Sequence, residues 1–280
     1  DPNYSATASG TLVITVTALV RHAPSLDGGL DGSLQVLTGE SLSLNGNAWV
    51  SGDLLAPGTP TVRLNGHPTF AGTRDGTGSS SPSNYQLTLN GNAVLRYLVR
   101  RTDPIAMPVV SAPPSPTGTR NVSLNSASGS AGDFSTIRNL TLNGNAGNRT
   151  VPAGTYGNFV ADGNSGFVLG VAGAITPAVY NLQGLTLNGS AQLQIAGPVV
   201  IVLANGGSID GAVAATGNPA WLTLAVASGG VTLNGNVVFR GSIVAPAGTV
   251  TINGNATLTG VVVADRLTIN GNGLLKQVTP

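Results

Sequence analysis

One tripeptide recurs along the chain and restricts the possible folds more than any other feature of the sequence. Leu/Ile-Asn-Gly starts at Leu44, Leu64, Leu89, Leu142, Leu187, Leu233, Ile252 and Ile269. These copies lie 20, 25, 53, 45, 46, 19 and 17 residues apart, and an imperfect copy, VSLNS at 122–126, divides the longest interval. A period of about 20 residues is typical of solenoids, in which each repeat forms one coil of a stack.

Each repeat consists of short strand-like segments joined by tight turns. In GVTLNGNVVFRGSIVAPAG (230–248), residues alternate around Leu233, and Asn-Gly follows as a turn because both residues tolerate positive φ. Two more short strands follow, and no segment has helical periodicity. We therefore expect an all-β protein, a right-handed parallel β-helix of ten to twelve coils. A meander of β-hairpins is the alternative interpretation of Asn-Gly, but it would not need turns at a fixed period.

The repeated Asn predicts a ladder of side chains along one corner of this rod. The Leu or Ile before it points inward, and the Thr before that points outward, since successive side chains of a strand alternate. At a strand spacing of about 4.8 Å, Asn amides in neighbouring coils can hydrogen-bond to one another. The predicted ladder comprises Asn45, Asn65, Asn90, Asn143, Asn188, Asn234, Asn253 and Asn270.

Composition excludes several classes of function. Charged residues make up 8% of the chain and the net charge is +1, so there is no field to attract nucleic acid. The chain has no cysteine, which excludes disulfides. The longest apolar run, 12–20, is too short for a transmembrane helix. No cofactor-binding motif is present, and we expect no cofactor.

The sequence predicts no catalytic and no metal-binding residue. Most acidic residues adjoin Gly, as in the Asp27-Gly and Asp31-Gly pairs, which is typical of turns. These two Asp could hold Ca²⁺, but their spacing matches no calcium-binding loop. The two histidines, His22 and His67, are far apart, and His67 takes the place of the second Asn of Asn-Gly-Asn. A polysaccharide-active enzyme would need a pair of carboxylates that no pattern here supplies.

Two surface features are weaker candidates for a binding site. Arg96, Arg100 and Arg101 form the only basic cluster, which is either a solvated edge or a contact for an anionic glycan or a neighbouring subunit. The outward Thr column raises the possibility of ice binding, which requires two such residues per coil. Only Thr249 and Thr251 form that doublet, so the sequence predicts a surface that is too narrow for ice.

The C-terminal part of the chain resembles a known family. Residues 217–272 contain GNPAWLT, GGVTLNGN, GSIVAPAG and a closing LTINGN, and residues 151–159 read VPAGTYGNF. These motifs resemble the C-terminal β-solenoid domain of bacterial PilX-like type IV pilus-associated proteins, a domain of unassigned function. A weaker likeness links the closing coils to secreted bacterial adhesin-type and ice-binding β-solenoids. The resemblance implies a β-solenoid fold and no catalytic residues.

The resulting expectation is a non-enzymatic structural or interaction protein on the bacterial cell surface or outside the cell. The resemblance implies display on a pilus-like filament, with self-association or other surface subunits as partners. The alternatives are a polysaccharide-active enzyme and a glycan-binding or ice-binding solenoid.

The Asn-Gly motif also suggests how the chain is divided. We expect a β-helix over 33–280, with a Pro-rich excursion across its surface at about 100–120. Residues 1–32 lack the motif and are expected to be a strand segment that follows a missing N-terminal helix. Residues 1–24 in particular are expected to act as a mount whose removal leaves the rod folded.

Overall fold

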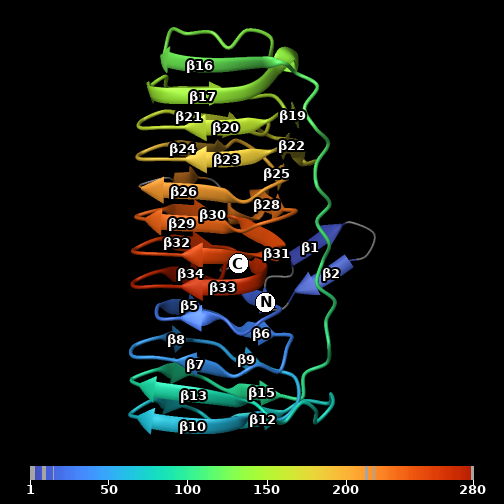
Figure 1. Ribbon diagram of the computed structural model, residues 1–280, viewed down its shortest axis with the longest axis vertical. Coiled ribbons are helices and arrows are strands. Elements are labelled where there is room, and N and C mark those ends of the chain that lie inside the picture. The colour runs from blue at the N-terminus through green and yellow to red at the C-terminus, as the bar shows by residue number, and fades with distance from the viewer. Residues whose placement is uncertain (1–3, 8–10, 15, 212–213, 217, 279–280) are drawn as a thin grey trace.

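In a computed structural model, the protein is a rod of stacked parallel β-coils (Figure 1). The structure describes residues 4–7, 11–14, 16–211, 214–216 and 218–278. Each coil except the uppermost, which contributes only β16 (Arg120–Ser126), supplies one short strand to each of three faces, so the predicted all-β solenoid is confirmed. Every strand pair in the described part of the rod is parallel, so the hairpin interpretation of Asn-Gly is wrong.

On each face the strands follow one another from the upper to the lower end of the rod in Figure 1. The first face contains β16 (Arg120–Ser126), β17 (Ile137–Asn145), β20 (Asn158–Ala161), β23 (Gly184–Leu187), β26 (Gly207–Gly211), β29 (Val231–Gly235), the ends of β31 (Ser242–Ile252) and β33 (Val262–Ile269), β4 (Ser25–Leu26), β7 (Leu42–Leu44), β13 (Gln86–Gly91) and β10 (Thr61–Gly66). The second face contains β18 (Asn148–Thr150), β21 (Gly166–Leu169), β24 (Gln192–Ile195), β27 (Ala214–Thr216), β30 (Val238–Arg240), β32 (Thr257–Thr259), β34 (Leu274–Lys276), β5 (Gly29–Asp31), β8 (Trp49–Val50), β14 (Val94–Leu95) and β11 (Thr69–Phe70). The third face contains β19 (Gly154–Thr155), β22 (Ala178–Leu182), β25 (Val199–Leu203), β28 (Leu222–Val226), the starts of β31 and β33, β3 (Ala18–Val20), β6 (Leu34–Val36), β9 (Leu54–Leu55), β15 (Leu98–Arg100) and β12 (Thr73–Asp75).

Three kinds of element lie outside these faces or between their strands. The strands β1 (Tyr4–Thr7) and β2 (Thr11–Ile14) pair with each other in antiparallel fashion. Two short 3₁₀ helices, η1 (Phe134–Thr136) and η2 (Pro219–Trp221), lie in connections between strands. No helix in the described part of the chain is long and apolar enough to cross a membrane.

The interior of the rod is a continuous apolar core, which is mostly aliphatic but contains the stacked rings of Phe159 and Phe167 in its upper coils. The Leu or Ile of each Asn-Gly motif except Leu64 is buried, because it points between the faces and packs on the same position of the coils above and below. Leu64 is 52% exposed because its strand, β10, is the last one at the lower end of the rod. In the turns, Gly46, Gly91 and Gly254 have φ between 60° and 69°, a backbone conformation that a side chain would disfavour.

The lower coils do not stack in the order of the sequence. The coil of 86–100 lies between the coil of 42–55 and the coil of 61–75, since β13 pairs with both β7 and β10. The third face repeats this order, with β15 between β9 and β12. The chain therefore skips one position when it builds the end coil, and then fills that position.

The Pro-rich segment carries the chain from the lower end of the rod to the upper end. After β15, residues 101–119 run along the side of the rod to β16, as Figure 1 shows. The side chains of Ile105, Met107 and Val110 pack on the outer side of the third face, against buried residues that include Leu19 and Val263. The predicted surface excursion is thus present, and it covers a face whose outer residues are apolar.

From the upper end the chain descends again, and its last coil closes onto its first strands. The end of β33 and strand β34 supply two sides of one coil, and β3 supplies the third side. β3 pairs with β33 above it and with β6 below it, and its three residues are completely buried. One coil is therefore built from both ends of the chain.

This split coil corrects the expectation for the N-terminal segment. The absence of the Asn-Gly motif predicts that residues 1–24 lie outside the rod and that the rod starts at 33. Instead, β3, β4 and β5 are strands of the rod. They need no Asn-Gly corner, because β3 lies on the third face and the corner after β4 is formed by Asp27 and Gly28. Residue 15 lies outside the described residues; of the strand expected over 12–20, the structure describes β2 up to Ile14 and β3 from Ala18.

Candidate functional site

A file of hydroxyl groups runs along the outside of the first face. It is formed by the outward residue that precedes the inward Leu, Ile or Ala (Leu64 in the end coil), and the pairing of the strands aligns these residues in one column. We call this column the hydroxyl file: Ser123, Thr141, Val160, Thr186, Ser208, Thr232, Thr251, Thr268, Ser25, Ser43, Thr88 and Arg63. All positions except Val160 and Arg63 are Ser or Thr, and Arg63 belongs to the end coil.

A second file lies two residues further along each strand, at the corner of the rod. We call it the amide file: Asn125, Asn143, Asp162, Asn188, Asp210, Asn234, Asn253, Asn270, Asp27, Asn45, Asn90 and Asn65. It contains all eight Asn of the predicted ladder. The remaining positions are Asn125 and three Asp.

Hydrogen bonds between coils hold the amide file in place. Asn270 donates to Asn253, and Asn253 donates to Asn234, each over 2.7 Å. In the lower coils Asn65 donates to Asn90 and Asn90 donates to Asn45, each over 2.8 Å. In each of these bonds the donor amide is in the lower coil, so the Nδ2 groups point toward the upper end of the rod. Fixed amides of this kind have already lost their rotamer freedom in the free protein.

Two of the three Asp serve as rungs of the same ladder. Asn188 donates to Asp162 over 2.7 Å, and Asn234 donates to Asp210, which also accepts a bond from Ser208. A carboxylate can replace an amide here because it accepts from the coil below. The two Asp lie two coils apart, with Asn188 between them.

The structure corrects the expected width of this surface, because it shows two aligned files of side chains where the sequence predicts one. The alternation along the strand predicts the second hydroxyl two residues before the Thr, where Gly230 and Arg266 stand in two of the coils. The second ordered file lies on the other side, two residues after the Thr. Coils without the Asn-Gly motif also supply hydroxyls, as Ser25 and Ser208 do. Only the strand pairing aligns these residues with the motif Thr.

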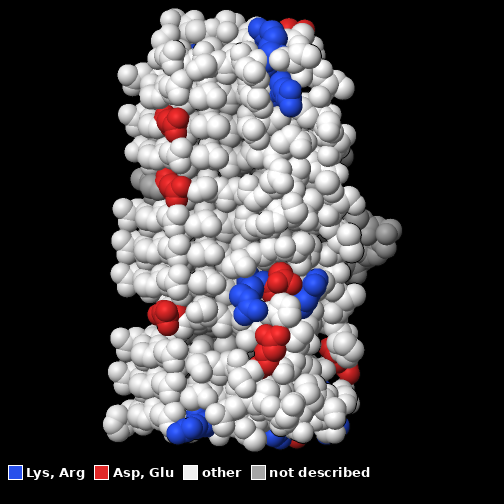
Figure 2. Space-filling model, viewed as in Figure 1, with Lys and Arg blue, Asp and Glu red and all other residues white. Residues whose placement is uncertain are grey.

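The first face is regular and carries little charge. Its strands lie in front in Figure 1, and Figure 2 shows the same side with Lys, Arg, Asp and Glu on few positions. Members of the hydroxyl file are half-buried or exposed, and their neighbours along the strand point into the core. The face therefore presents short polar side chains at the spacing of the strands, about 4.8 Å.

The three Arg that the sequence singles out are held separately. Arg96 Nε lies 2.7 Å from the Asp53 carboxylate, and Arg100 lies 2.8 Å from Asp75. Arg101 Nε donates to the carbonyl of Gly78 over 2.9 Å. Each Arg thus has a partner within the chain. The interpretation as a contact site for an anionic glycan or a subunit stays a prediction.

One cluster of titratable groups is not foreseen from the sequence. His22 Nδ1 lies 2.6 Å from Glu40 Oε1, and the backbone N–H of Ala23 donates to Glu40 Oε2 over 3.0 Å. Arg21 lies 3.4 Å from Asp265, and this ion pair connects the chain just after β3 with β33. The bond from His22 is the main cause that lowers the pKa of Glu40 below its usual value of 4.5. The cluster joins residues near the two ends of the chain at the split coil.

The other candidate residues are kept apart by the fold. Asp27 stands in the amide file, whereas Asp31 lies at the far end of β5 and accepts a bond from Ser51 over 2.8 Å. The described residues contain no group of three or more His, Cys, Asp or Glu side chains that could hold a metal ion. His67 occupies the turn position of the second Asn, and its N–H donates to Gly91, as the N–H of Asn92 does to Gly46.

Comparison with known proteins adds little to this description. No known protein family and no curated protein matches the chain. Among solved structures, the crystal structure of an ice-binding protein from an Antarctic bacterium, Flavobacteriaceae, matches at 16% sequence identity and a TM-score of 0.29. The match covers 95% of this chain and 82% of that protein. At so low a TM-score the match supports no functional conclusion, and function has to follow from the geometry of the first face.

Proposed function

We propose that this protein is a non-enzymatic ice-binding β-solenoid that contacts ice through the hydroxyl and amide files of its first face. The observation that carries the proposal is the regular double file, with Ser or Thr in ten of its twelve coils. Such a face holds its hydrogen-bonding groups at a fixed repeat along the rod. An ice surface also presents its water molecules at a fixed repeat.

Rigidity supports this assignment. The Thr side chains are stiff at χ1, and the Asn side chains are fixed by bonds to their neighbours. Neither file must be ordered when ice binds, so the entropic cost of binding is small. The low charge of the face also matters, because charged groups hold their own hydration shells strongly.

The proposal places the protein outside the cell or on its surface, where growing ice is first met. Display on a pilus-like filament and association with other surface subunits stay predictions that follow from the sequence resemblance alone. The exposed Leu64 on the end strand β10 offers one place where a further chain could pair.

The test is a measurement of thermal hysteresis and of ice-crystal shape with the purified protein. The double variant Thr232→Tyr, Thr251→Tyr places two bulky rings in the hydroxyl file and should lose most of the activity. The matched control, Thr257→Tyr with Thr259→Tyr, changes two outward Thr of β32 on the second face and should keep it. Circular dichroism confirms that both variants are folded.

Two results would contradict the proposal. The first is a wild-type protein that neither depresses the freezing point nor shapes ice crystals. The second is equal activity in both double variants, which would move the active surface elsewhere. Tight binding to crystalline cellulose or chitin without ice activity would identify the first face as a polysaccharide-binding surface instead.

A further inference from the structure

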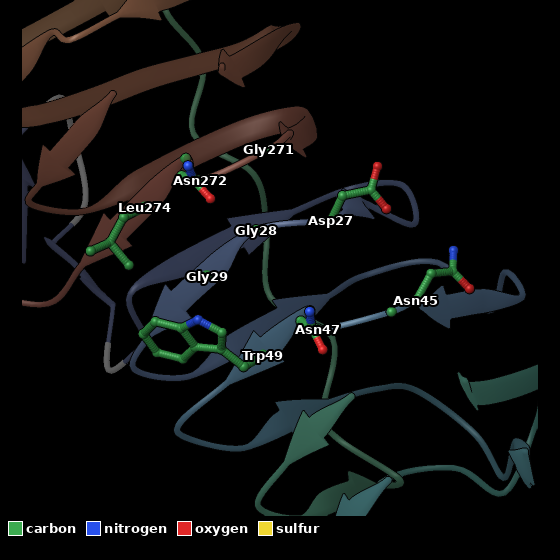
Figure 3. Close-up of a pocket in the computed structure, with 11 residues that line it drawn as sticks. Asp27, Gly28, Gly29, Asn45, Asn47, Trp49, Gly271, Asn272 and Leu274 are labelled. Carbon is green, nitrogen blue, oxygen red and sulfur yellow. The ribbon is translucent and has the colours of Figure 1, made fainter. Parts of the chain in front are cut away.

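A notch interrupts the corner of the rod between the first and second faces. In the coil of β7 and β8, four residues, 45–48, separate Leu44 from Trp49. In the next coil up, only Asp27 and Gly28 separate Leu26 from Gly29, although the flanking strands remain in register. This shorter corner leaves a cavity of about 680 Å³ between the turns of 45–47 and 271–273 (Figure 3). Its size lies within the range of small-molecule sites, about 300–1,000 Å³.

The short corner also interrupts the outer ladder of turn Asn residues. Above the notch, Asn272 Nδ2 donates to Asn255 over 3.0 Å, which turns Asn272 Oδ1 toward the notch. Below it, Asn47 Oδ1 accepts from Asn92 over 3.4 Å, which leaves the Nδ2 of Asn47 turned toward the notch. The two walls therefore offer an acceptor and a donor to a group that would take the place of the missing rung.

The backbone shows the same missing rung. In several complete corners, although not in that of Asn272, the N–H of the second turn Asn donates to a Gly carbonyl of the coil above it, as Asn92 does to Gly46 and Asn255 does to Gly235. The corresponding N–H of Asn47 and carbonyl of Gly271 have no such bond within the described part of the chain. Polar groups without partners are satisfied by solvent or by a ligand.

Asp27 supplies the third polar group. It stands in the amide file between Asn270 and Asn45. The other two Asp of this file, Asp162 and Asp210, each accept a bond from the Asn of the coil below. Among the described residues the side chain of Asp27 has no hydrogen bond and no ion pair, and no Lys or Arg lines the notch. Asp27 is one of the residues that line the notch, and in Figure 3 it lies on the side opposite Trp49 and Leu274.

An aromatic ring forms one side of the notch. Trp49, the first residue of β8, is half-buried and lies against Gly29, where a Cβ would come within 2.4 Å of the ring. The absence of a side chain at Gly29 lets the indole lie on the backbone of the next coil. The ring and Leu274 give the notch its apolar wall.

We propose that this notch binds a single neutral sugar ring, a pyranose unit of a glycan. A hydroxyl group both donates and accepts, so one sugar hydroxyl can bond to Asn272 Oδ1 and Asn47 Nδ2 and complete the ladder. A second hydroxyl donates to Asp27, and the C–H face of the ring packs on Trp49. Anions are disfavoured by Asp27 in the absence of a cation, and cations leave the donors of Asn47 without an acceptor. The site shares Asp27 with the amide file, but Asn47, Trp49 and Asn272 lie outside both files, and the proposal does not depend on ice binding.

The test uses the fluorescence of Trp49. The chain has two Trp, and the variant Trp221→Phe leaves Trp49 as the single indole reporter. This variant is titrated with the methyl glycosides of glucose, mannose, galactose and N-acetylglucosamine. At least one of them should cause a saturable change. In the otherwise unchanged protein, Trp49→Ala should weaken binding of that glycoside at least tenfold by calorimetry, and Asp27→Asn should weaken it by a smaller factor.

A filled notch provides the sharpest control. Replacing Asp27-Gly28 by Asn-Gly-Asn-Ala restores the four-residue corner of the neighbouring coils and supplies the missing rung. This variant should abolish sugar binding without lowering the unfolding midpoint. Asn164→Ala, in the corner between β20 and β21 and several coils from the notch, should bind as the wild type does. No saturable change with any of the four glycosides, or unchanged binding in the filled variant, would overturn the proposal.

Discussion

At the scale of single residues, the alternation within each Asn-Gly repeat decides which side chains are in the core. Leu233 is completely buried, whereas its neighbour Thr232 points outward in the hydroxyl file. The same two-residue alternation appears at Leu89 and Thr88. The inward position is therefore sensitive to polarity and the outward position is not, although the two are adjacent in sequence.

The variant Leu233→Asp should lose roughly 3 kcal/mol or more of unfolding free energy, because it buries a carboxylate without a partner. The matched variant Thr232→Asp introduces the same group one residue earlier and should change stability by less than about 1 kcal/mol. Urea denaturation followed by circular dichroism measures both. Equal midpoints for the two variants would mean that the column of inward residues is misassigned.

At the scale of elements, the short strand β3 contributes more to the rod than its length suggests. Its residues Ala18, Leu19 and Val20 are fully buried, and it pairs with β6 on one side and β33 on the other. Its side chains also connect two layers, since Ala18 and Val20 face the central core and Leu19 packs under the Pro-rich segment.

Two truncations test the place of β3. Removal of residues 1–14 takes away β1 and β2, which pair with each other, and should leave the unfolding midpoint unchanged. Removal of residues 1–24 also takes away β3. Each large apolar side chain that loses its burial costs about 1.5–3 kcal/mol of unfolding free energy. The strands β6 and β33 are then left with unpaired edges. The midpoint of the second truncation should fall clearly below that of the first. Identical thermal and urea midpoints would mean that the rod does not need residues 16–24, as expected from the sequence for a mount.

At the scale of the whole molecule, the rod depends on contact between the two ends of the chain. The split coil places β3 beside β33 and β4 beside the end of β33, more than 200 residues away in sequence. The charged cluster of Arg21, His22, Glu40 and Asp265 lies at this junction. Stability at the junction should therefore respond to pH.

Glu40 sets the direction of that response. Its pKa is lowered in the folded protein, chiefly by the bond from His22, so ionised Glu40 contributes stability that is fully present above its unfolded pKa of 4.5. That contribution is lost as the pH falls below 4.5 and through the folded pKa. This contribution is small because Glu40 and the charged groups around it, Arg21, Asp265 and Arg266, are partly or fully exposed. Solvent therefore screens the interactions between them.

Urea midpoints measured between about pH 6 and pH 3 should fall more steeply for the wild type than for Glu40→Gln. The Gln side chain keeps one acceptor for the Ala23 N–H but does not titrate. A conservative change of an exposed acid elsewhere, Asp103→Asn, should follow the wild type. Parallel curves for the wild type and Glu40→Gln would show that the junction does not depend on this charge.

The sequence by itself determined the local rules of the coil. Alternation identified the inward Leu and Ile, Asn-Gly identified the corner, and the fixed period required parallel stacking with an Asn ladder. The Pro residues of 104–116 identified a segment that cannot pair within a sheet. These features are local because each depends on a few neighbouring residues and on the strand spacing.

Only the tertiary structure decided which coil lies on which. Every coil offers the same row of backbone donors and acceptors, so the repeat cannot specify that 86–100 inserts above 61–75 or that β3 closes the last coil. The stacking order in turn aligned Ser25 and Ser208 with the motif Thr, and placed the short Asp27-Gly28 corner between two complete corners. Both proposed binding surfaces depend on that order, because each is built from residues of coils that are distant in the sequence.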